Sequence, residues 1–289
     1  MKHSIAKFLT TVAASAVMAS ASAAASHPAF NVEVHGSGQP IILIPGLASP
    51  GAVWDDSVKH FCGQRQCHVL SLAGFAGVPA VPGPFIAGVE QQLSDYIAAN
   101  KLDKPIVMGH SLGAFIGLKL AADHPDQVSR LVVVDTLPAI GARVQPDIST
   151  QQLKDMAEGM RQQMLKQSSD ETAAHMKYTL STMVNSPATA EQLLAWGTKS
   201  DRATVANAMY EMTADDLRND VARIKAPTLV LGSWIAYKQY GPREMFEFTY
   251  RSQFAKLPNV TIALSDTAKH FIMYDDPSWM YANVDKFLK

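Results

Sequence analysis

The short motif in this chain most able to do chemistry is Gly109-His110-Ser111-Leu112-Gly113, where a serine lies near two glycines. An apolar run, "KPIVM", precedes it, and a helix-like stretch follows. A serine at such a boundary could cap the helix, because its hydroxyl accepts bonds from free backbone N–H groups. A cap does not need both glycines, whereas a nucleophile on a tight strand-to-helix turn needs small residues two positions away. The motif therefore favours Ser111 as a nucleophile.

A serine hydroxyl becomes reactive only when a base takes its proton. The chain has nine histidines, and most lie where no catalytic role is expected: at the N-terminus, beside the cysteines or at helix ends. His270 is different, because it follows the last apolar run, "TIALSDTAK", and precedes the final helical pattern. The Gly-x-Ser-x-Gly motif between an apolar run and a helix resembles that of the α/β-hydrolase superfamily, which places its catalytic histidine after the last strand and after the serine in the chain. The resemblance implies that His270 is the base.

The elements that must position these residues alternate along the chain. Short apolar runs predict buried strands, and helical patterns separate them. Because strands alternate with helices, we expect an α/β fold with a mostly parallel, doubly wound sheet whose carboxyl edge carries the site. The predicted strands are "FNVEVHG", "PIILIPG", "CHVLSLAG", "KPIVMGH", "SRLVVVDT", "APTLVLGS" and "NVTIALSD"; the helices are "GVEQQLSDYIAANKL", "LGAFIGLKLAADH" and "PSWMYANVDKFLK".

One long stretch interrupts this alternation. Residues 138–221 contain helical patterns and no buried-strand run, and they hold seven of the 13 methionines. We interpret them as a helical cap inserted into a core made of residues 26–137 and 222–289. Methionine at helical spacing is typical of ordinary core, and it also suits a pliable apolar pocket lining. The sequence leaves both roles open.

The first 25 residues have the composition of a signal peptide. Lys2 and Lys7 give a positive start, residues 8–18 are apolar, and Ala21-Ser22-Ala23 offers small residues for cleavage. A membrane anchor is the alternative, but the apolar stretch is shorter than the roughly 20 residues that a spanning helix needs. We therefore predict an exported protein, periplasmic or secreted, with no stable membrane anchor.

The predicted export bears on the oxidation state of the two cysteines. Cys62 and Cys67 are the only cysteines in the sequence, and in an oxidising compartment a local disulfide is expected. A zinc site is the alternative, but only His60 and His68 flank the pair, and zinc usually takes four ligands. We predict the disulfide and no metal.

The composition restricts the partners. Hydrophobic residues make up 47% of the chain and charged residues 18%, with a formal net charge of −1. These values are typical of a folded globular protein, and no basic stripe indicates a nucleic-acid partner. We expect a small-molecule substrate and no cofactor; the oligomeric state is not predicted.

Together, "ILIPGL", "GHSLG", the helical insertion and "AKHFIMYDDP" resemble the α/β-hydrolase superfamily over essentially the whole mature chain. The resemblance implies a mostly parallel sheet of about eight strands with a cap inserted after the sixth. It also implies an oxyanion hole made by the backbone N–H groups of Leu112, next to the nucleophile, and of Leu47, in the loop after "IILIPG".

The position of the catalytic acid departs from the family pattern. The family commonly places it after the strand that follows the cap, but the loop "GSWIAYKQYG" has no carboxylate. Its aromatic residues Trp234, Tyr237 and Tyr240 either line a pocket or pack between sheet and cap.

Some haloalkane dehalogenases carry the acid at the end of the strand before the cap, and this chain resembles them in that position. The residue there is Asp135, at the end of "SRLVVVD". We expect Asp135 to orient His270; Glu244 or Asp266, or no acid at all, are the alternatives. Asp275 and Asp276 are expected to be structural carboxylates at a helix end. Dehalogenase chemistry does not carry over, because those enzymes have an aspartate where this chain has Ser111.

The sequence thus predicts an exported serine hydrolase that cleaves a carboxylic ester having an apolar or aromatic portion. C–C bond hydrolases, amidases, lactonases and perhydrolases use the same residue types and are not separated by these motifs. A binding protein on a hydrolase scaffold that has lost its activity is the third hypothesis.

Overall fold

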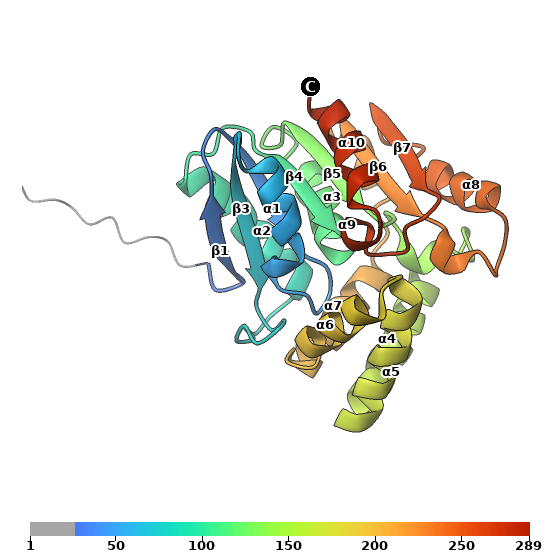
Figure 1. Cartoon of the computed structure of the whole chain (residues 1–289). Coiled ribbons are helices and arrows are strands. Elements are labelled where there is room, and N and C mark those ends of the chain that lie inside the picture. Colours follow the sequence, from blue (N-terminus) through green and yellow to red (C-terminus); the bar gives the residue numbers. More distant parts are fainter. Residues whose placement is uncertain (1–26) are drawn as a thin grey trace, which may run out of the picture.

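The seven predicted strands form one sheet in the computed structural model, which describes residues 27–289. Their order across the sheet is β1-β3-β2-β4-β5-β6-β7; β1 pairs antiparallel with β3, and the other neighbouring pairs are parallel. The predicted mostly parallel α/β fold is confirmed (Figure 1). The strands are β1 (Phe30–His35), β2 (Gln39–Ile44), β3 (Arg65–Leu72), β4 (Ile106–His110), β5 (Arg130–Val134), β6 (Thr228–Ser233) and β7 (Val260–Ser265).

Helices cover both faces of this sheet, and two apolar clusters fill the space between. On one face, α2, α3 and α8 contribute buried side chains such as Leu93, Phe115 and Tyr250. On the other, α1 and α10 contribute Phe61 and Val284. The α-helices outside the cap are α1 (Asp55–Phe61), α2 (Phe85–Ala99), α3 (Leu112–Asp123), α8 (Arg243–Gln253), α9 (Ile272–Asp275) and α10 (Pro277–Leu288).

The register places the ends of the central strands side by side. His110, the last residue of β4, pairs with Val134 of β5, and Val134 pairs with Leu231 of β6. The backbone continues this pattern, because Ser111 donates its N–H to Val134 and Asp135 donates its N–H to Leu231, both at 2.8 Å. The residues after β4 and β5 therefore lie at one edge of the sheet, as the sequence predicted.

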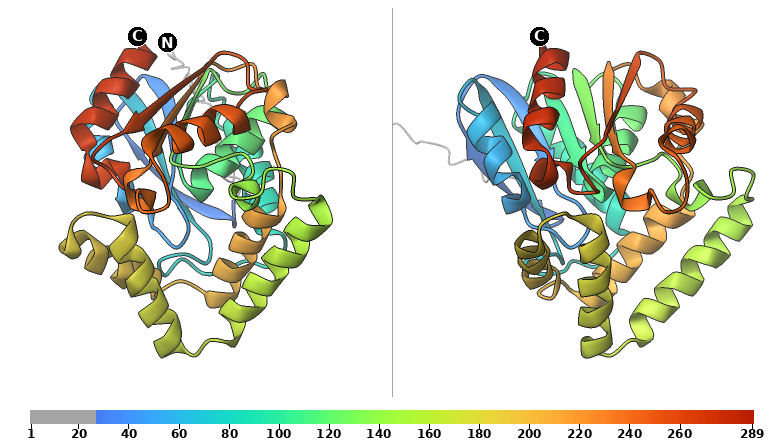
Figure 2. Two further views of the ribbon diagram at one scale, coloured as in Figure 1. Left: turned by 90° about the vertical axis from the view of Figure 1, so that its right-hand side faces the viewer. Right: turned by 45° about the vertical axis from the view of Figure 1, so that its right-hand side comes forward.

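Four helices between β5 and β6 form the inserted cap: α4 (Thr150–Lys166), α5 (Ser169–Met183), α6 (Pro187–Gly197) and α7 (Arg202–Ala214). They lie beyond the carboxyl edge of the sheet (Figure 2). α4 packs on α7, and α5 packs on α6. The first pair joins the α2–α3 side through Val205 and Met212, and the second joins the α1–α10 side through Leu180 and Leu193. The cap thus has two halves, each continuous with the core on a different face of the sheet. The domain limits of residues 138 and 221 stay a prediction.

Cys62, which ends α1, and Cys67 of β3 form the predicted disulfide, with their Cα atoms 5.7 Å apart. The predicted signal peptide, residues 1–25, lies outside the described residues. Among the helices of residues 27–289, none is long and apolar enough to cross a membrane.

Candidate active site

Ser111 occupies a strained turn between β4 and α3. Its φ is 51°, and although it precedes the first residue of α3, its side chain makes no capping hydrogen bond. A Cβ atom on Gly109 would lie 2.3 Å from the carbonyl oxygen of Gly113, and one on Gly113 would lie 2.3 Å from that of Ile44. Both glycines are therefore required by close backbone contacts. The turn holds Ser111 half-buried with its hydroxyl uncommitted to the helix, which is the geometry of a nucleophile elbow rather than a cap.

Asp135 and His270 form a hydrogen bond at this edge of the sheet. The Nδ1 atom of His270 lies 2.6 Å from Oδ2 of Asp135. Asp135 is only 6% exposed, and its φ of 53° turns its side chain out of the strand direction at the end of β5. Because an ionised carboxylate only accepts hydrogen bonds, Nδ1 of His270 carries the proton. In the neutral imidazole, a proton on Nδ1 leaves Nε2 without one and able to act as a base.

Two residues that the sequence did not single out hold Asp135 in place. Ser233 donates its backbone N–H to Oδ1 at 2.7 Å and its hydroxyl to Oδ2 at 3.0 Å, and Tyr250 donates its hydroxyl to Oδ1 at 2.7 Å. Burial, and next the negative charge of Asp135, raise the pKa of Tyr250 well above its usual value. Tyr250 therefore stays a hydrogen-bond donor, and the buried carboxylate has a donor for each of its lone-pair directions.

The backbone on the other side of Ser111 offers two free donors. A Cβ atom on Gly46, in the loop after β2, would lie 3.3 Å from the Cβ of Ser111, so this loop runs against the elbow. Within residues 27–289, neither Leu47 nor Leu112 donates its backbone N–H to another protein group. The N–H of Leu112 is free because it belongs to the first turn of α3. Leu112 follows Ser111 in the chain, and Leu47 follows Gly46, which contacts Ser111. Their role in an oxyanion hole stays a prediction.

His270 also touches the elbow through His110. The Nε2 atom of His110 lies 3.1 Å from the backbone oxygen of His270, and the two ring centroids are 4.6 Å apart. Burial, and next the neighbouring His270, lower the pKa of His110 well below its usual value, so His110 is a neutral donor to that carbonyl. The described residues contain no hydrogen bond between Ser111 and His270; catalytic contacts of this kind often tighten only when substrate binds.

Comparison with known proteins agrees with the fold described above. Residues 39–277, most of the chain, match the family model described as the alpha/beta hydrolase fold. The chain belongs to this family.

Individual relatives of the α/β-hydrolase chain are distant. It is 29% identical over 123 residues to a pimeloyl-[acyl-carrier protein] methyl ester esterase of Vibrio cholerae, a match covering 41% of this chain and 47% of the esterase. The chain thus spans less than half the length of this curated relative. It is 25% identical over 264 residues to an N-formylmaleamate deformylase of Pseudomonas putida, covering 88% of this chain and 90% of that protein. The solved structure of an esterase from Exiguobacterium antarcticum superposes with a TM-score of 0.75 at 15% identity, covering 90% and 95% of the two chains; at that identity the likeness shows the fold.

The other carboxylates considered for this α/β-hydrolase do not bond to His270. Asp266 is 64% exposed and accepts bonds from Trp234 Nε1 at 2.9 Å and Arg243 Nε at 2.8 Å. Glu244 lies exposed in the first turn of α8. Of the three carboxylates predicted, only Asp135 is placed beside the histidine.

The three aromatic residues of the loop after β6 differ in their surroundings. Trp234 is bonded to Asp266 and packs against the core, while the ring of Tyr237 lies 4.6 Å from the guanidinium carbon of Arg143. Tyr240 is 71% exposed. Trp234 and Tyr237 thus have packing partners in the protein, and a pocket role for these three residues stays a prediction.

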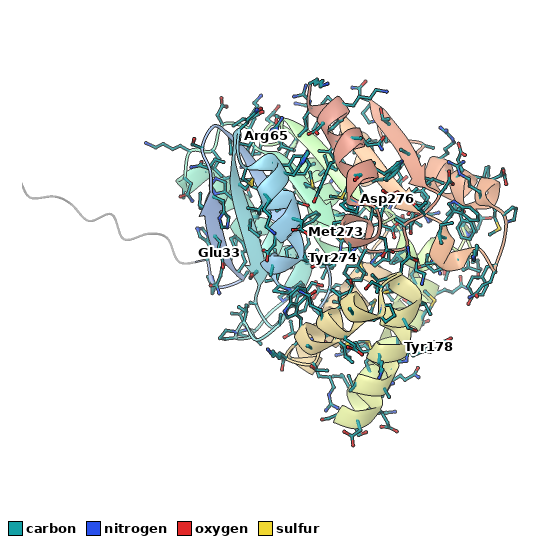
Figure 3. The ribbon with its side chains drawn as sticks, in the orientation of Figure 1. Glu33, Arg65, Tyr178, Met273, Tyr274 and Asp276 are labelled. Atoms are coloured by element: carbon teal, nitrogen blue, oxygen red, sulfur yellow. A yellow bond between two sulfur atoms is a disulfide. The ribbon has the colours of Figure 1, made fainter. Side chains whose placement is uncertain are left out.

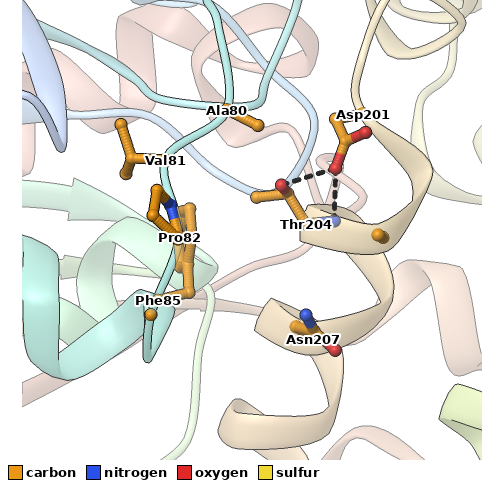
Figure 4. A pocket seen from close by; sticks show the side chains of 9 residues that line it. Ala80, Val81, Pro82, Phe85, Asp201, Thr204 and Asn207 are labelled. Atoms are coloured by element: carbon orange, nitrogen blue, oxygen red, sulfur yellow. Dashed lines mark hydrogen bonds between the residues drawn. The ribbon is translucent and has the colours of Figure 1, made fainter.

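A surface cavity of about 280 Å³ lies elsewhere in this hydrolase fold, between residues 80–85 and the start of α7 (Figure 4). Asp201, just before α7, and Thr204 and Asn207 of α7 line it. Asp201 already accepts bonds from the backbone N–H and hydroxyl of Thr204, at 2.8 and 2.7 Å. Neither Ser111 nor His270 lines this cavity, so it is separate from the site.

Proposed function

We propose that the protein is a serine hydrolase that cleaves a carboxylic ester through an acyl-enzyme on Ser111. The observation that carries this proposal is the part-buried 2.6 Å contact between Asp135 and His270, at the same edge of the sheet as a serine held on a strained turn. A hydrogen-bonded acid and histidine next to an uncommitted serine hydroxyl is the arrangement that converts a weak nucleophile into a strong one.

In the proposed reaction, Ser111 Oγ attacks the ester carbonyl carbon while Nε2 of His270 takes the hydroxyl proton. The resulting oxyanion accepts hydrogen bonds from the N–H groups of Leu47 and Leu112, and Asp135 stabilises the imidazolium. His270 then gives its proton to the departing alkoxide as the C–O bond breaks. In the second half, His270 takes a proton from water as the water oxygen attacks the acyl carbon. His270 then gives this proton to Ser111 Oγ as the acyl C–Oγ bond breaks, and the carboxylic acid is released.

Two observations support an ester with an apolar portion. The relative and the solved structure described above include proteins named as esterases. Met164 of α4 and Met209 of α7 are partly buried cap residues packed against the core, and flexible thioether side chains adapt to apolar ligands. Deformylation is the second candidate, because the relative that covers 88% of this chain is named a deformylase. The same residues could also serve C–C bond hydrolysis, lactone hydrolysis or perhydrolysis.

Labelling with a fluorophosphonate probe tests the nucleophile directly. Wild-type protein is expected to be labelled on Ser111 and the Ser111→Ala variant to remain unlabelled. Absence of labelling in folded wild-type protein would overturn the proposal and favour a binding function. Turnover of p-nitrophenyl esters of increasing chain length, compared with lactones, amides and N-formyl compounds, then identifies the bond that is cleaved.

We also propose that the protein is exported. The composition of residues 1–25 and the Cys62–Cys67 disulfide support this proposal, because disulfides persist in oxidising compartments. Expression of the full chain in a bacterium, followed by N-terminal sequencing of the periplasmic and medium fractions, tests it. We expect a mature N-terminus close to residue 26; full-length protein confined to the cytoplasm would contradict export.

A further inference from the structure

The loop that carries His270 is bonded to the cap as well as to the core. We call residues 267–271 the histidine loop and residues 181–186, which end α5 and lead into α6, the cap junction. Lys269 donates its Nζ to the carbonyl oxygens of Ser181 and Val184 at 3.3 and 3.1 Å. The backbone N–H of Phe271 donates to Met183 at 3.3 Å. The residues on both sides of His270 are therefore tied to the cap.

Asp275 adds a bridge between the same two segments. Its Oδ2 accepts the backbone N–H of Lys269 at 2.9 Å, and its Oδ1 accepts the backbone N–H of Asn185 at 2.8 Å. The Asn185 side chain in turn donates to the carbonyl of Thr267 at 3.0 Å. One carboxylate at the end of α9 thus uses both oxygens to hold the histidine loop against the cap junction.

Apolar contacts back these polar ones. Phe271, Ile272 and Met273 are buried in the same cluster as Val184, and Met183 packs against that cluster. Figure 3 labels Met273 and Tyr274 on α9, next to the cap helices. Leu180 and Met176 of α5 belong to or pack against this cluster as well, whereas Tyr178 of the same helix is 71% exposed.

The other half of the cap is anchored elsewhere. In α7, Glu211 accepts the backbone N–H groups of Phe85 and Ile86 at the start of α2, both at 2.7 Å. Asp201, just before α7, donates its N–H to Gly74 at 2.7 Å. These contacts bind α7 to the loop after β3 and to α2, on the opposite face of the sheet from α9. The two halves of the cap therefore have different attachments.

We propose that the cap junction positions His270, with Asp275 and Asn185 as positioning residues. This inference rests on the proposed serine hydrolase function. A base must be held within a fraction of an ångström of its working geometry, and a shift of about 1 Å from remote residues costs on the order of a hundredfold in rate. The cap is thus a structural part of the catalytic machinery on its α5–α6 side, not only a cover for the substrate.

The experiment compares Asp275→Asn and Asn185→Ala with the control Glu171→Gln. Glu171 is matched because its carboxylate also accepts a backbone N–H, that of Ser168 at 2.7 Å, but at the far end of α5. For Asp275→Asn we expect kcat and the rate constant of fluorophosphonate labelling to fall by about tenfold to a hundredfold, with KM within about twofold of wild type. Asn185→Ala should show the same pattern with a smaller loss, and Glu171→Gln should match wild type.

A second readout follows the His270–Asp135 contact without catalysis. The proton on Nδ1 of His270, in a 2.6 Å bond to a carboxylate, should give a strongly downfield proton NMR signal. We expect that signal to shift or broaden in Asp275→Asn and Asn185→Ala and to persist in Glu171→Gln.

Each outcome decides a different question. If wild type reacts with the probe but both variants label, turn over and resonate like the control, the cap junction does not position His270. If wild type does not react at all, the proposed function fails, and an unchanged NMR signal in the variants would then overturn the positioning role separately. Should Asp275→Asn fail to fold, Asn185→Ala, which removes only an exposed side chain, decides the matter.

Discussion

Ser111 and Asp135 are each the first residue after a central strand, β4 and β5, and each has a positive φ; we call these two positions the Ser111 corner and the Asp135 corner. They are held in different ways. The Ser111 corner depends largely on its own neighbours, since a Cβ on Gly109 would meet Gly113, although a Cβ on Gly113 would meet Ile44 of β2. The Asp135 corner depends on distant residues, because its carboxylate is bonded from β6, α8 and the histidine loop. Local sequence therefore shapes the first corner, and tertiary structure shapes the second.

The largest expected effect separates the chemistry of the two corners. Ser111→Ala removes the proposed nucleophile, and we expect turnover to fall by about a millionfold, the order seen when a catalytic serine is lost in a comparable triad. The unfolding free energy should change by less than about 1 kcal/mol, because the substitution shortens a half-buried side chain. Ester turnover and urea denaturation measure the two. Activity close to wild type would remove Ser111 from the mechanism.

The next effect tests the second corner. Asp135→Asn should lower kcat by about ten-thousandfold, because an amide favours the wrong tautomer of His270. Asp266→Asn is the matched control: it is also an aspartate near the histidine loop but is exposed and bonded to Arg243. If the control loses activity and Asp135→Asn keeps it, the assignment of the acid is wrong.

Gly109→Ala tests whether the first corner depends on its local backbone. The added Cβ would lie 2.3 Å from the backbone of Gly113, too close for any rotamer change to relieve. We expect the free energy of unfolding to fall by about 3 kcal/mol or more, because the backbone itself must move. Gly159→Ala in α4, where a Cβ meets no atom within 4 Å, should be neutral or slightly stabilising. Equal urea midpoints for the two variants would contradict this account.

Tyr250→Phe tests the distributed support of Asp135 by removing one of its donors. We expect kcat to fall by about tenfold and stability by about 1–3 kcal/mol, because a buried carboxylate loses a hydrogen bond. Tyr240→Phe, on a residue that is 71% exposed, provides the same substitution without that contact and should resemble wild type. A Tyr250→Phe variant indistinguishable from this control would show that the remaining donors suffice.

The smallest expected effect is a dependence of the unfolding free energy on pH, caused by buried histidines, one of which, His110, precedes Ser111. Burial lowers the pKa of His110, and of His68 in β3, below their usual values. Below about pH 6.5 the unfolded chain binds protons that the folded protein excludes, so stability is lost as pH falls, by up to about 1.4 kcal/mol per pH unit for each group. Urea denaturation across this range measures the slope. It should be smaller in His68→Asn and unchanged in His175→Asn, an exposed cap residue; an equal slope in all three proteins would contradict the assignment.

The comparison also explains what could be predicted from the sequence. The strands and the Ser111 elbow were predictable because apolar runs and the Gly-x-Ser-x-Gly spacing are local sequence patterns, although the contact that requires Gly113 is with Ile44. Asp135 was reached through a family resemblance rather than through its surroundings. Tyr250 was missed because it shares the buried face of α8 with Phe246 and Phe254, where a tyrosine is typical of core. Its contact with Asp135 spans 115 residues and has no local signal.

The packing of the cap helices on one another was less predictable, because it also depends on contacts between residues far apart in the chain. The sequence predicted helices between β5 and β6 but not that α4 packs on α7 and α5 on α6. Amphipathic helices show which face is buried without showing which partner covers it. The contacts of Asp275 with Lys269 and Asn185 depend on that pairing, so a carboxylate expected to be a helix-end residue also holds two backbone segments together.

The nesting of the cap helices makes α5 and α6 a separable module. The backbone oxygen of Gln167, which follows α4, accepts a hydrogen bond from the side chain of Arg202 at the start of α7, so the segments before and after the module lie within reach of one arginine side chain. A short turn could join those ends, or a helical hairpin from another protein could be grafted there, with the α4–α7 pair left intact. A substrate-range library built this way would have to retain residues 181–186, because a graft that discards them also discards the contacts to the loop that carries His270.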